Sequence, residues 1–204
     1  MTTGIDSEIM TKNTTAVLLL VSVVLISSAV AAVIVFGNYS GADPEPGGSN
    51  LDGLIDDLGA FGYPLSGDLF EIKLQNTAGR FVRLDDYRGR IVFLNFWTTW
   101  CPTCRTEMPS MERLHRKLLD KDFAMVTVNI KESAAQVKTF FDKYKLSFTA
   151  LLDPTGEVST AFGVRAIPTT FILDKGGTII GSITGPREWD SRKFVDLFAH
   201  LADG

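Results

Sequence analysis

Two cysteines separated by two residues are the side chains in this sequence that point most clearly to chemistry. Cys101 and Cys104 are the only cysteines of the 204-residue chain. They follow a short apolar segment, Ile91–Phe96, that is typical of a central strand covered on both faces. The next residues predict a helix, and unpaired N–H groups and the positive dipole at its N-terminus would stabilise a thiolate on Cys101. Cys104 returns to the same end of the helix, where it could attack a mixed disulfide on Cys101.

Other uses of a cysteine pair fit this sequence less well. A structural disulfide that closes a loop of two residues gains little from loop entropy. A zinc site needs about four ligands, but the chain has no second cysteine pair, and its two histidines, His115 and His200, are far apart in the sequence. A c-type haem site has histidine directly after the second cysteine, where this chain has Arg105. The pattern therefore favours redox chemistry.

Segments with strand and helix patterns alternate around the cysteines. The helix that begins at about Cys101 continues to Leu119, with methionines and leucines spaced by three and four residues and an expected kink at Pro109. Further strands are predicted at Phe123–Val128, Ala150–Leu152, Thr169–Leu173 and Thr178–Ile183, helices at Ala134–Tyr144, Val158–Phe162 and about Trp189–Leu201, and a hairpin at Phe70–Gln75 and Arg80–Leu84. This order indicates an α/β fold with a mixed sheet flanked by helices.

The segment Phe96–Pro109 (FWTTWCPTCRTEMP) resembles the active-site segment of thioredoxin-fold proteins. It is most similar to the membrane-anchored TlpA/ResA-like branch of thiol–disulfide oxidoreductases. The resemblance extends from about Phe70 to Leu201 and includes LDDYRG at 84–89 and AIPTTF at 166–171. It implies a thioredoxin-like fold and thiol–disulfide exchange as the activity.

Carried over by position, the resemblance assigns roles to individual residues. Cys101 matches the attacking thiol and Cys104 the resolving thiol of a redox-active disulfide. Pro168 matches a cis-proline that packs beside the disulfide, and Ile167 matches the position whose backbone pairs with an extended substrate. Trp100 is expected to shield the disulfide, although a half-buried core aromatic is an equally good interpretation of it. The expected substrate-binding residues are Trp100, Pro102, Ile167 and Pro168.

Two polar residues near the cysteines separate this chain from thioredoxins proper. Those proteins place a buried Asp directly before the Phe-Trp pair, whereas this chain has Asn95, which cannot act as a general base for the resolving thiol. The TlpA/ResA-like branch has an acid three residues after the second cysteine, and Glu107 occupies that position. Glu107 is either a functional acid of this kind or an ordinary first-turn glutamate that favours the helix dipole.

Residues 16–36 predict a membrane anchor. They contain no charged side chain, and as a helix they are long enough to cross a bilayer core of about 30 Å. A cleaved signal peptide is the alternative, since Ala29-Val30-Ala31 resembles a cleavage site, but the apolar run continues beyond it. Lys12 is the only base before the span, so the positive-inside rule favours a cytoplasmic N-terminus.

The residues after the apolar run change abruptly in composition. Residues 37–50 are rich in Gly, Pro, Ser and acids, which is typical of a solvated tether. The expected organisation is a short cytoplasmic segment at 1–15, a transmembrane helix at 16–36, a flexible linker at 37–50 and a thioredoxin-like domain at 51–204.

The charge pattern argues against nucleic acid as a partner. Beyond residue 50 the chain carries 20 acidic and 19 basic side chains, with no block of Lys or Arg. Binding to phosphates or to an anionic surface depends on such blocks. The expected partners are instead proteins with disulfides, as substrates, and a membrane dithiol protein as electron donor, because no nucleotide-binding glycine motif occurs.

Together these features predict a single-pass protein of the bacterial cytoplasmic membrane whose extracytoplasmic domain reduces protein disulfides, for example in the maturation of cytochrome c or of a cofactor site. No cofactor or metal is needed. A reductant is expected because a buried, ionised Glu107 would oppose a thiolate and hold the pKa of the Cys101 thiol at or above that of thioredoxin, about 7.

Two other functions remain as alternatives. A thioredoxin-fold copper chaperone is one, although that group resembles C-x-x-x-C with a distal histidine. A peroxiredoxin-like peroxidase is the other, because Thr98 lies three residues before Cys101, as in the motif of that family.

Overall fold

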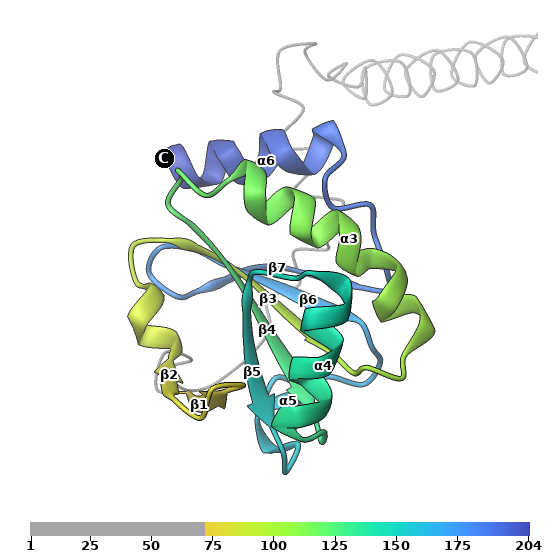
Figure 1. Cartoon of the computed structure of the whole chain (residues 1–204). Helices are drawn as coiled ribbons and strands as arrows, with labels where there is room; N and C mark the ends of the chain where they lie inside the picture. The colour runs from red at the N-terminus through yellow and green to blue at the C-terminus, as the bar shows by residue number, and fades with distance from the viewer. Residues whose placement is uncertain (1–71) are drawn as a thin grey trace, which may run out of the picture. The chain divides into compact units, whose positions relative to one another are not determined.

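A seven-stranded mixed sheet organises residues 72–204, the part of the chain that the computed structural model describes (Figure 1). Its strands are β1 (Lys73–Asn76), β2 (Phe81–Arg83), β3 (Ile91–Trp97), β4 (Phe123–Ile130), β5 (Thr149–Asp153), β6 (Thr169–Leu173) and β7 (Ile179–Thr184). The order across the sheet is β2-β1-β5-β4-β3-β6-β7. Strands β3, β4 and β5 run parallel, and every other neighbouring pair is antiparallel. The predicted mixed sheet is confirmed.

Helices lie on both faces of this sheet. The helices α3 (Pro102–Lys117), α4 (Ala134–Tyr144) and α6 (Arg192–Asp203) share one hydrophobic core with Phe93 and Trp97 of β3. Figure 1 shows α3 and α6 beside each other above the sheet. The 3-10 helix η2 (Leu84–Tyr87) and the short helix α5 (Glu157–Ala161) belong to the second core, on the opposite face.

Strand β3 is the element that positions the cysteines. All seven of its residues are buried, and they alternate between the two cores, with Phe93 and Trp97 in one and Val92, Leu94 and Phe96 in the other. Both faces of the strand are therefore covered, as its nearly continuous apolar sequence predicts. The chain leaves this fixed strand at Trp97 and enters α3 at Pro102, so the cysteine pair lies at the carboxyl edge of the parallel strands.

The predicted helices and strands are all found in the described region, and the differences are confined to their ends. The last helix is the largest correction, because it begins at Arg192 and not at Trp189. Trp189 is fully buried before the helix starts, and the Ser191 N–H closes a turn onto the Glu188 carbonyl. The apolar spacing of the helix therefore extends to Trp189, which is a buried residue of the preceding loop and not part of the helix.

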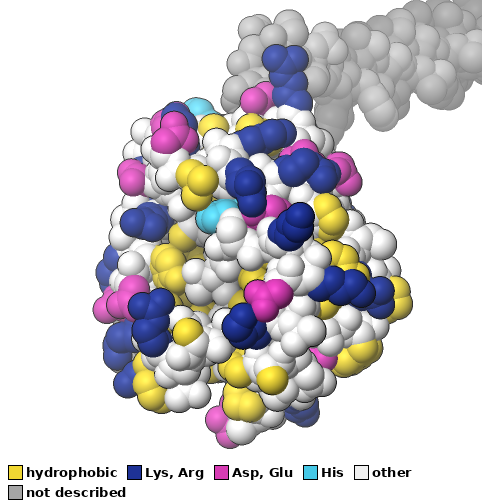
Figure 2. Space-filling view, viewed as in Figure 1, with side chains coloured by type: hydrophobic (Ala, Val, Ile, Leu, Met, Phe, Trp, Pro, Cys, Tyr) yellow, Lys and Arg dark blue, Asp and Glu magenta, His cyan; other side chains and the backbone are white. Residues whose placement is uncertain are grey.

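Several expectations lie outside the described residues: the segment at 1–15, the transmembrane helix at 16–36, the linker at 37–50 and the start of the domain at 51. Within residues 72–204, none of the helices combines the length and the apolar character that a membrane crossing requires. On the face of the domain drawn in Figure 2, Lys and Arg side chains alternate with Asp and Glu side chains and form no single basic field.

Candidate active site

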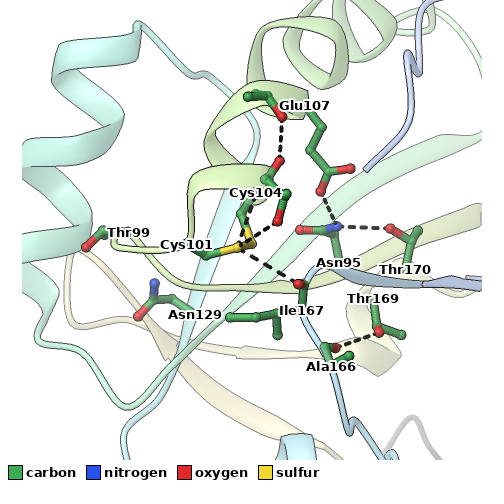
Figure 3. The surroundings of a disulfide bond; sticks show 12 residues. Asn95, Thr99, Cys101, Cys104, Glu107, Asn129, Ala166, Ile167, Thr169 and Thr170 are labelled. Carbon is green, nitrogen blue, oxygen red and sulfur yellow. Dashed lines mark hydrogen bonds between the residues drawn. A yellow bond between two sulfur atoms is a disulfide. The ribbon is translucent and has the colours of Figure 1, made fainter. Parts of the chain in front are cut away.

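The two cysteines form a disulfide at the start of α3 (Figure 3). Cys101 is the N-cap residue of this helix, and its sulfur accepts a hydrogen bond from the backbone N–H of Cys104 at 3.1 Å. Pro102 is exposed at the first helical position, where a missing N–H costs no hydrogen bond. A thiolate on Cys101 would receive the same N–H and the positive end of the helix dipole. The local geometry thus favours a nucleophilic sulfur on Cys101.

Both cysteines are almost completely buried, and Cys104 lies deeper than Cys101. Cys101 is 3% exposed and Cys104 is fully buried beneath it. Trp100, directly before them, is 68% exposed, so its interpretation as a half-buried core aromatic is wrong. An incoming substrate disulfide would meet Trp100 and Cys101 before Cys104. This order agrees with attack by Cys101 and resolution by Cys104.

The loop before β6 forms the opposite side of the disulfide. The Ile167 carbonyl oxygen lies 3.9 Å from the Cys101 sulfur, and the Ile167–Pro168 peptide bond is cis, as the resemblance implies. Pro168 is buried, and the Thr169 hydroxyl donates a hydrogen bond to the Ala166 carbonyl, which holds the loop closed. The fold thus brings residues 167 and 168 to a disulfide that is more than sixty positions away in the sequence.

Glu107 is buried one helical turn below the cysteines and is not an exposed first-turn glutamate. It is 1% exposed, and its carboxylate accepts hydrogen bonds from Asn95 Nδ2 at 3.1 Å, Trp189 Nε1 at 2.8 Å and the Arg187 N–H at 3.3 Å. Burial raises its pKa to about 7, against the lowering effect of the three hydrogen bonds. A group that titrates near neutral pH beside a disulfide has the character of a functional acid.

Asn95 joins Glu107 to the interior of the sheet. Its amide nitrogen donates both to Glu107 and, at 2.9 Å, to the Thr170 hydroxyl on β6. Its amide oxygen is buried and has no hydrogen-bond partner among residues 72–204. In Figure 3 this oxygen points away from Glu107 and toward the side of the cysteines. An unpaired buried acceptor is uncommon, because it loses its hydration without compensation.

These contacts modify the electrostatic argument that the sequence supports. That argument assumed an ionised Glu107, but with a pKa of about 7 the carboxyl is about half protonated at neutral pH. The Pro102-Thr103 dipeptide contains no cation that would offset the repulsion. In the structure the Thr103 hydroxyl lies 3.3 Å from the Cys101 sulfur and can donate to it. The repulsion is therefore weaker than expected, and a stabilising donor is present.

Replacing Thr103 with valine tests this donor. Valine keeps the shape of the side chain and removes the hydroxyl, so the Cys101 thiolate loses one hydrogen bond to a charged atom. We expect alkylation of reduced Cys101 by iodoacetamide at neutral pH to slow by roughly tenfold, the equivalent of about 1.4 kcal/mol. Thr106→Val is the matched control, because the Thr106 hydroxyl donates to the Thr103 carbonyl and not to sulfur. Equal alkylation rates for wild type and Thr103→Val would show that the Thr103 hydroxyl does not stabilise the Cys101 thiolate.

Sequence reasoning missed two residues that shape the site from a distance. Trp189 donates to Glu107 from 82 positions away. Glu132, after β4, accepts hydrogen bonds from the Thr99 N–H and hydroxyl and from the Asn129 amide, and so holds the loop that leads into Cys101. Neither residue belongs to a recognisable sequence motif. Only the pairing of β3 with β4 and the packing of the α6 loop against α3 bring them close.

Two observations bear on the alternative functions. The Thr98 hydroxyl is buried and has no hydrogen-bond partner among residues 72–204, so it makes no hydrogen bond to the Cys101 sulfur that it would have to orient in a peroxidase. In the same residues, no three His, Cys, Asp or Glu side chains come together as metal ligands. Neither alternative gains support from the described geometry.

Comparison with known proteins places these features in a family. Residues 67–182 match the AhpC/TSA family. The chain is 37% identical over 141 residues to the thiol-disulfide oxidoreductase ResA of Geobacillus thermodenitrificans, which covers 63% of this chain and 81% of that protein. It is 36% identical over 112 residues to ResA of Bacillus subtilis, which covers 55% of this chain and 63% of that protein.

Solved structures give the same result. A candidate thiol:disulfide interchange protein DsbE from Chlorobium tepidum has a TM-score of 0.60 at 28% identity, over 66% of this chain and 95% of that one. StoA from Bacillus subtilis has a TM-score of 0.54 at 27% identity, over 61% of this chain and 95% of that one. The fold, the Cys101–Cys104 disulfide and the sequence similarity therefore all indicate a thiol–disulfide oxidoreductase.

Proposed function

This chain belongs to the AhpC/TSA family, as a ResA-like thiol–disulfide oxidoreductase, and from that premise we propose that it reduces disulfides of other proteins outside the cytoplasm. The observation that carries the proposal is the position of Cys101. Its sulfur caps a helix N-terminus beside the exposed Trp100, with Cys104 buried directly behind it. A thiolate in this place is stabilised, reachable by a protein substrate, and backed by a second thiol that can release the product.

The reaction consists of two thiol–disulfide exchanges. In the reduced domain the Cys101 thiolate attacks one sulfur of a substrate disulfide, which forms a mixed disulfide and releases the other substrate sulfur as a thiolate. Cys104 then loses its proton and attacks the Cys101 sulfur, which restores the Cys101–Cys104 disulfide and releases the second substrate thiolate. Two electrons pass to the substrate, and a membrane dithiol protein supplies two electrons to reduce the domain again.

Neighbouring residues have distinct parts in these steps. We propose that the backbone at Ile167 aligns an extended substrate segment beside the sulfur, with Pro168 offering no competing N–H. Trp100 and Pro102 supply exposed contact surface next to Cys101. Glu107, with a pKa of about 7, can accept or return the proton that leaves a buried thiol during resolution. Of these residues, only Glu107 would act by transferring a proton.

We also propose that residues 16–36 anchor the domain to the bacterial cytoplasmic membrane, with residues 37–50 as the tether and the domain on the extracytoplasmic side. The uncharged apolar run and the single preceding base support this arrangement. Proteins that receive a cofactor on cysteine side chains, such as apocytochromes c, are substrates that suit a reductant there, because oxidised cysteines must be reduced before attachment.

The redox potential of the isolated domain tests the direction of the reaction. The domain is equilibrated with glutathione redox buffers, and the fraction of disulfide is measured by mass spectrometry after alkylation. The ionised fraction of Glu107 still opposes a thiolate, although less than a fully ionised carboxylate would, so we expect a potential nearer to that of thioredoxin, about −270 mV, than to that of the strong oxidant DsbA, about −120 mV. A potential above roughly −180 mV, the value for protein disulfide isomerase, would show that the domain is not built as a reductant.

A further inference from the structure

A groove runs beside the disulfide between the N-terminus of α3 and the exposed side of α4. Its volume is about 490 Å³, and it is lined by Thr99 and Arg105 on one side and by Gln136, Phe140, Lys143 and Tyr144 of α4 on the other. Thr99 precedes Trp100 and Arg105 follows Cys104, so the groove begins at the residues that flank the reacting sulfurs. A polypeptide bound at Cys101 would continue into it on one side of the disulfide.

The charge of this groove is set by two cations without counterions. Arg105 and Lys143 are exposed, and neither makes an ion pair within residues 72–204. The Lys143 ammonium lies 5.6 Å from the centre of the Tyr144 ring, which holds it at the rim. Glu132, which contacts Thr99 of the groove, accepts hydrogen bonds from Thr99 and Asn129, and Asp142, the neighbour of Lys143 in the chain, pairs with Lys138.

Given the proposed function, we propose that this groove binds an acidic segment of the substrate polypeptide, a few residues away from the substrate cysteine. The apolar faces of Phe140 and Tyr144 would contact the chain of the segment, and Arg105 and Lys143 would pair with its carboxylates. Charge complementarity of this kind selects partners and speeds their encounter more than it adds to affinity. The groove therefore determines which protein disulfides the domain reduces quickly.

Two synthetic peptides with one internal disulfide serve as probes. They are identical except that the residues next to one cysteine are Asp-Gly-Asp in the first and Lys-Gly-Lys in the second. The full chain is reduced, and the rate constants for the two peptides are compared as a ratio, which cancels changes in the intrinsic reactivity of Cys101. We expect wild type to prefer the acidic peptide by about fivefold at low ionic strength, and salt to reduce this ratio.

Variants assign the preference to the groove. The double variant Arg105→Gln with Lys143→Gln should bring the ratio close to one, and Arg105→Glu with Lys143→Glu should invert it. Lys138→Gln is the matched control, because Lys138 lies on the same helix but pairs with Asp142 and does not line the groove, so it should keep the wild-type ratio. A ratio that stays at the wild-type value in both double variants would overturn the proposal, even if both peptides react more slowly.

A failure of the proposed function would give a different result from a failure of the groove proposal. If wild type reduced neither peptide, thiol–disulfide exchange itself would be in doubt. If wild type reduced both at the same rate at low salt, the activity would stand and the acidic-segment proposal would fall. If Lys138→Gln changed the ratio as much as the double variant Arg105→Gln with Lys143→Gln, the preference would come from the net charge of the domain, which would also overturn the proposal.

Discussion

Replacing Cys104 with serine is expected to convert the domain from a catalyst into a trap for its substrates. Cys101 keeps its place at the N-cap of α3 and can still attack a substrate disulfide, but a serine hydroxyl cannot displace the product from the mixed disulfide. Turnover should fall by roughly a thousandfold or more, as is usual when an essential reacting group is removed. Covalent adducts should accumulate on Cys101. Non-reducing electrophoresis of the variant expressed in its native cells, followed by mass spectrometry, measures them.

Cys101→Ser is the matched control for this trap. It retains one cysteine at full burial behind the helix start and lacks the sulfur that contacts Thr103 and the Ile167 loop. It should neither turn over nor form adducts. If Cys101→Ser trapped substrates and Cys104→Ser did not, the roles of the two cysteines would be reversed. If neither variant trapped any protein, the two-step exchange would be wrong.

The stability of the oxidised domain is expected to fall between pH 5 and pH 8 because of Glu107. Burial raises the pKa of this carboxyl from 4.5 to about 7 in the folded state. Above pH 4.5 the unfolded chain releases the proton while the folded chain keeps it, so the unfolded state is favoured progressively until the folded carboxyl also ionises near pH 7. The shift of about 2.5 units corresponds to a loss of about 3 kcal/mol in the free energy of unfolding over the whole titration, from below pH 4.5 to above pH 7, and most of this loss falls between pH 5 and pH 8. Urea denaturation at a series of pH values measures it.

Glu107→Gln isolates this contribution. Glutamine has no titratable group, and its amide can be accommodated if Asn95 turns its unpaired oxygen to accept from it. We expect the variant to lose most of the difference in stability between pH 5 and pH 8. Burial lowers the pKa of His115, which opposes the trend in both proteins and cancels in the comparison. A wild-type slope that persists unchanged in Glu107→Gln would contradict the assignment.

The sequence predicted the parts of this structure that depend on local pattern. The apolar residues of β3 and the cysteines at the next helix start are adjacent in the chain, so their geometry follows from strand and helix rules alone. The bounds of α4 were predicted correctly from the spacing of its apolar face, and in the structure a capping box of Ser133 and Gln136 starts the helix at the same place. Pro168 was placed by resemblance, since its own type carries no signal for its position beside a disulfide.

The polar surroundings of the disulfide could not be derived in the same way. The pKa of Glu107 depends on how fully Trp189 and the residues before α6 cover it, and these come from 80 or more positions away. Trp189 instead looked like the first residue of an amphipathic helix. Burial and three converging donors are properties of the assembled core, and a single sequence does not contain the distances that define them.

The unpaired oxygen of Asn95 lets its amide adapt to the protonation state of Glu107. The two ends of an amide have nearly the same shape, so Asn95 can rotate without disturbing its packing, and the exchange places a donor where an acceptor had been. With Glu107 ionised, the amide nitrogen donates to the carboxylate, and the oxygen points toward the cysteine side in Figure 3. With Glu107 protonated, the carboxyl can donate to the turned oxygen, so Asn95 keeps a hydrogen bond to Glu107 in both protonation states. A rotation of this one amide therefore lets the pocket accommodate either protonation state of Glu107.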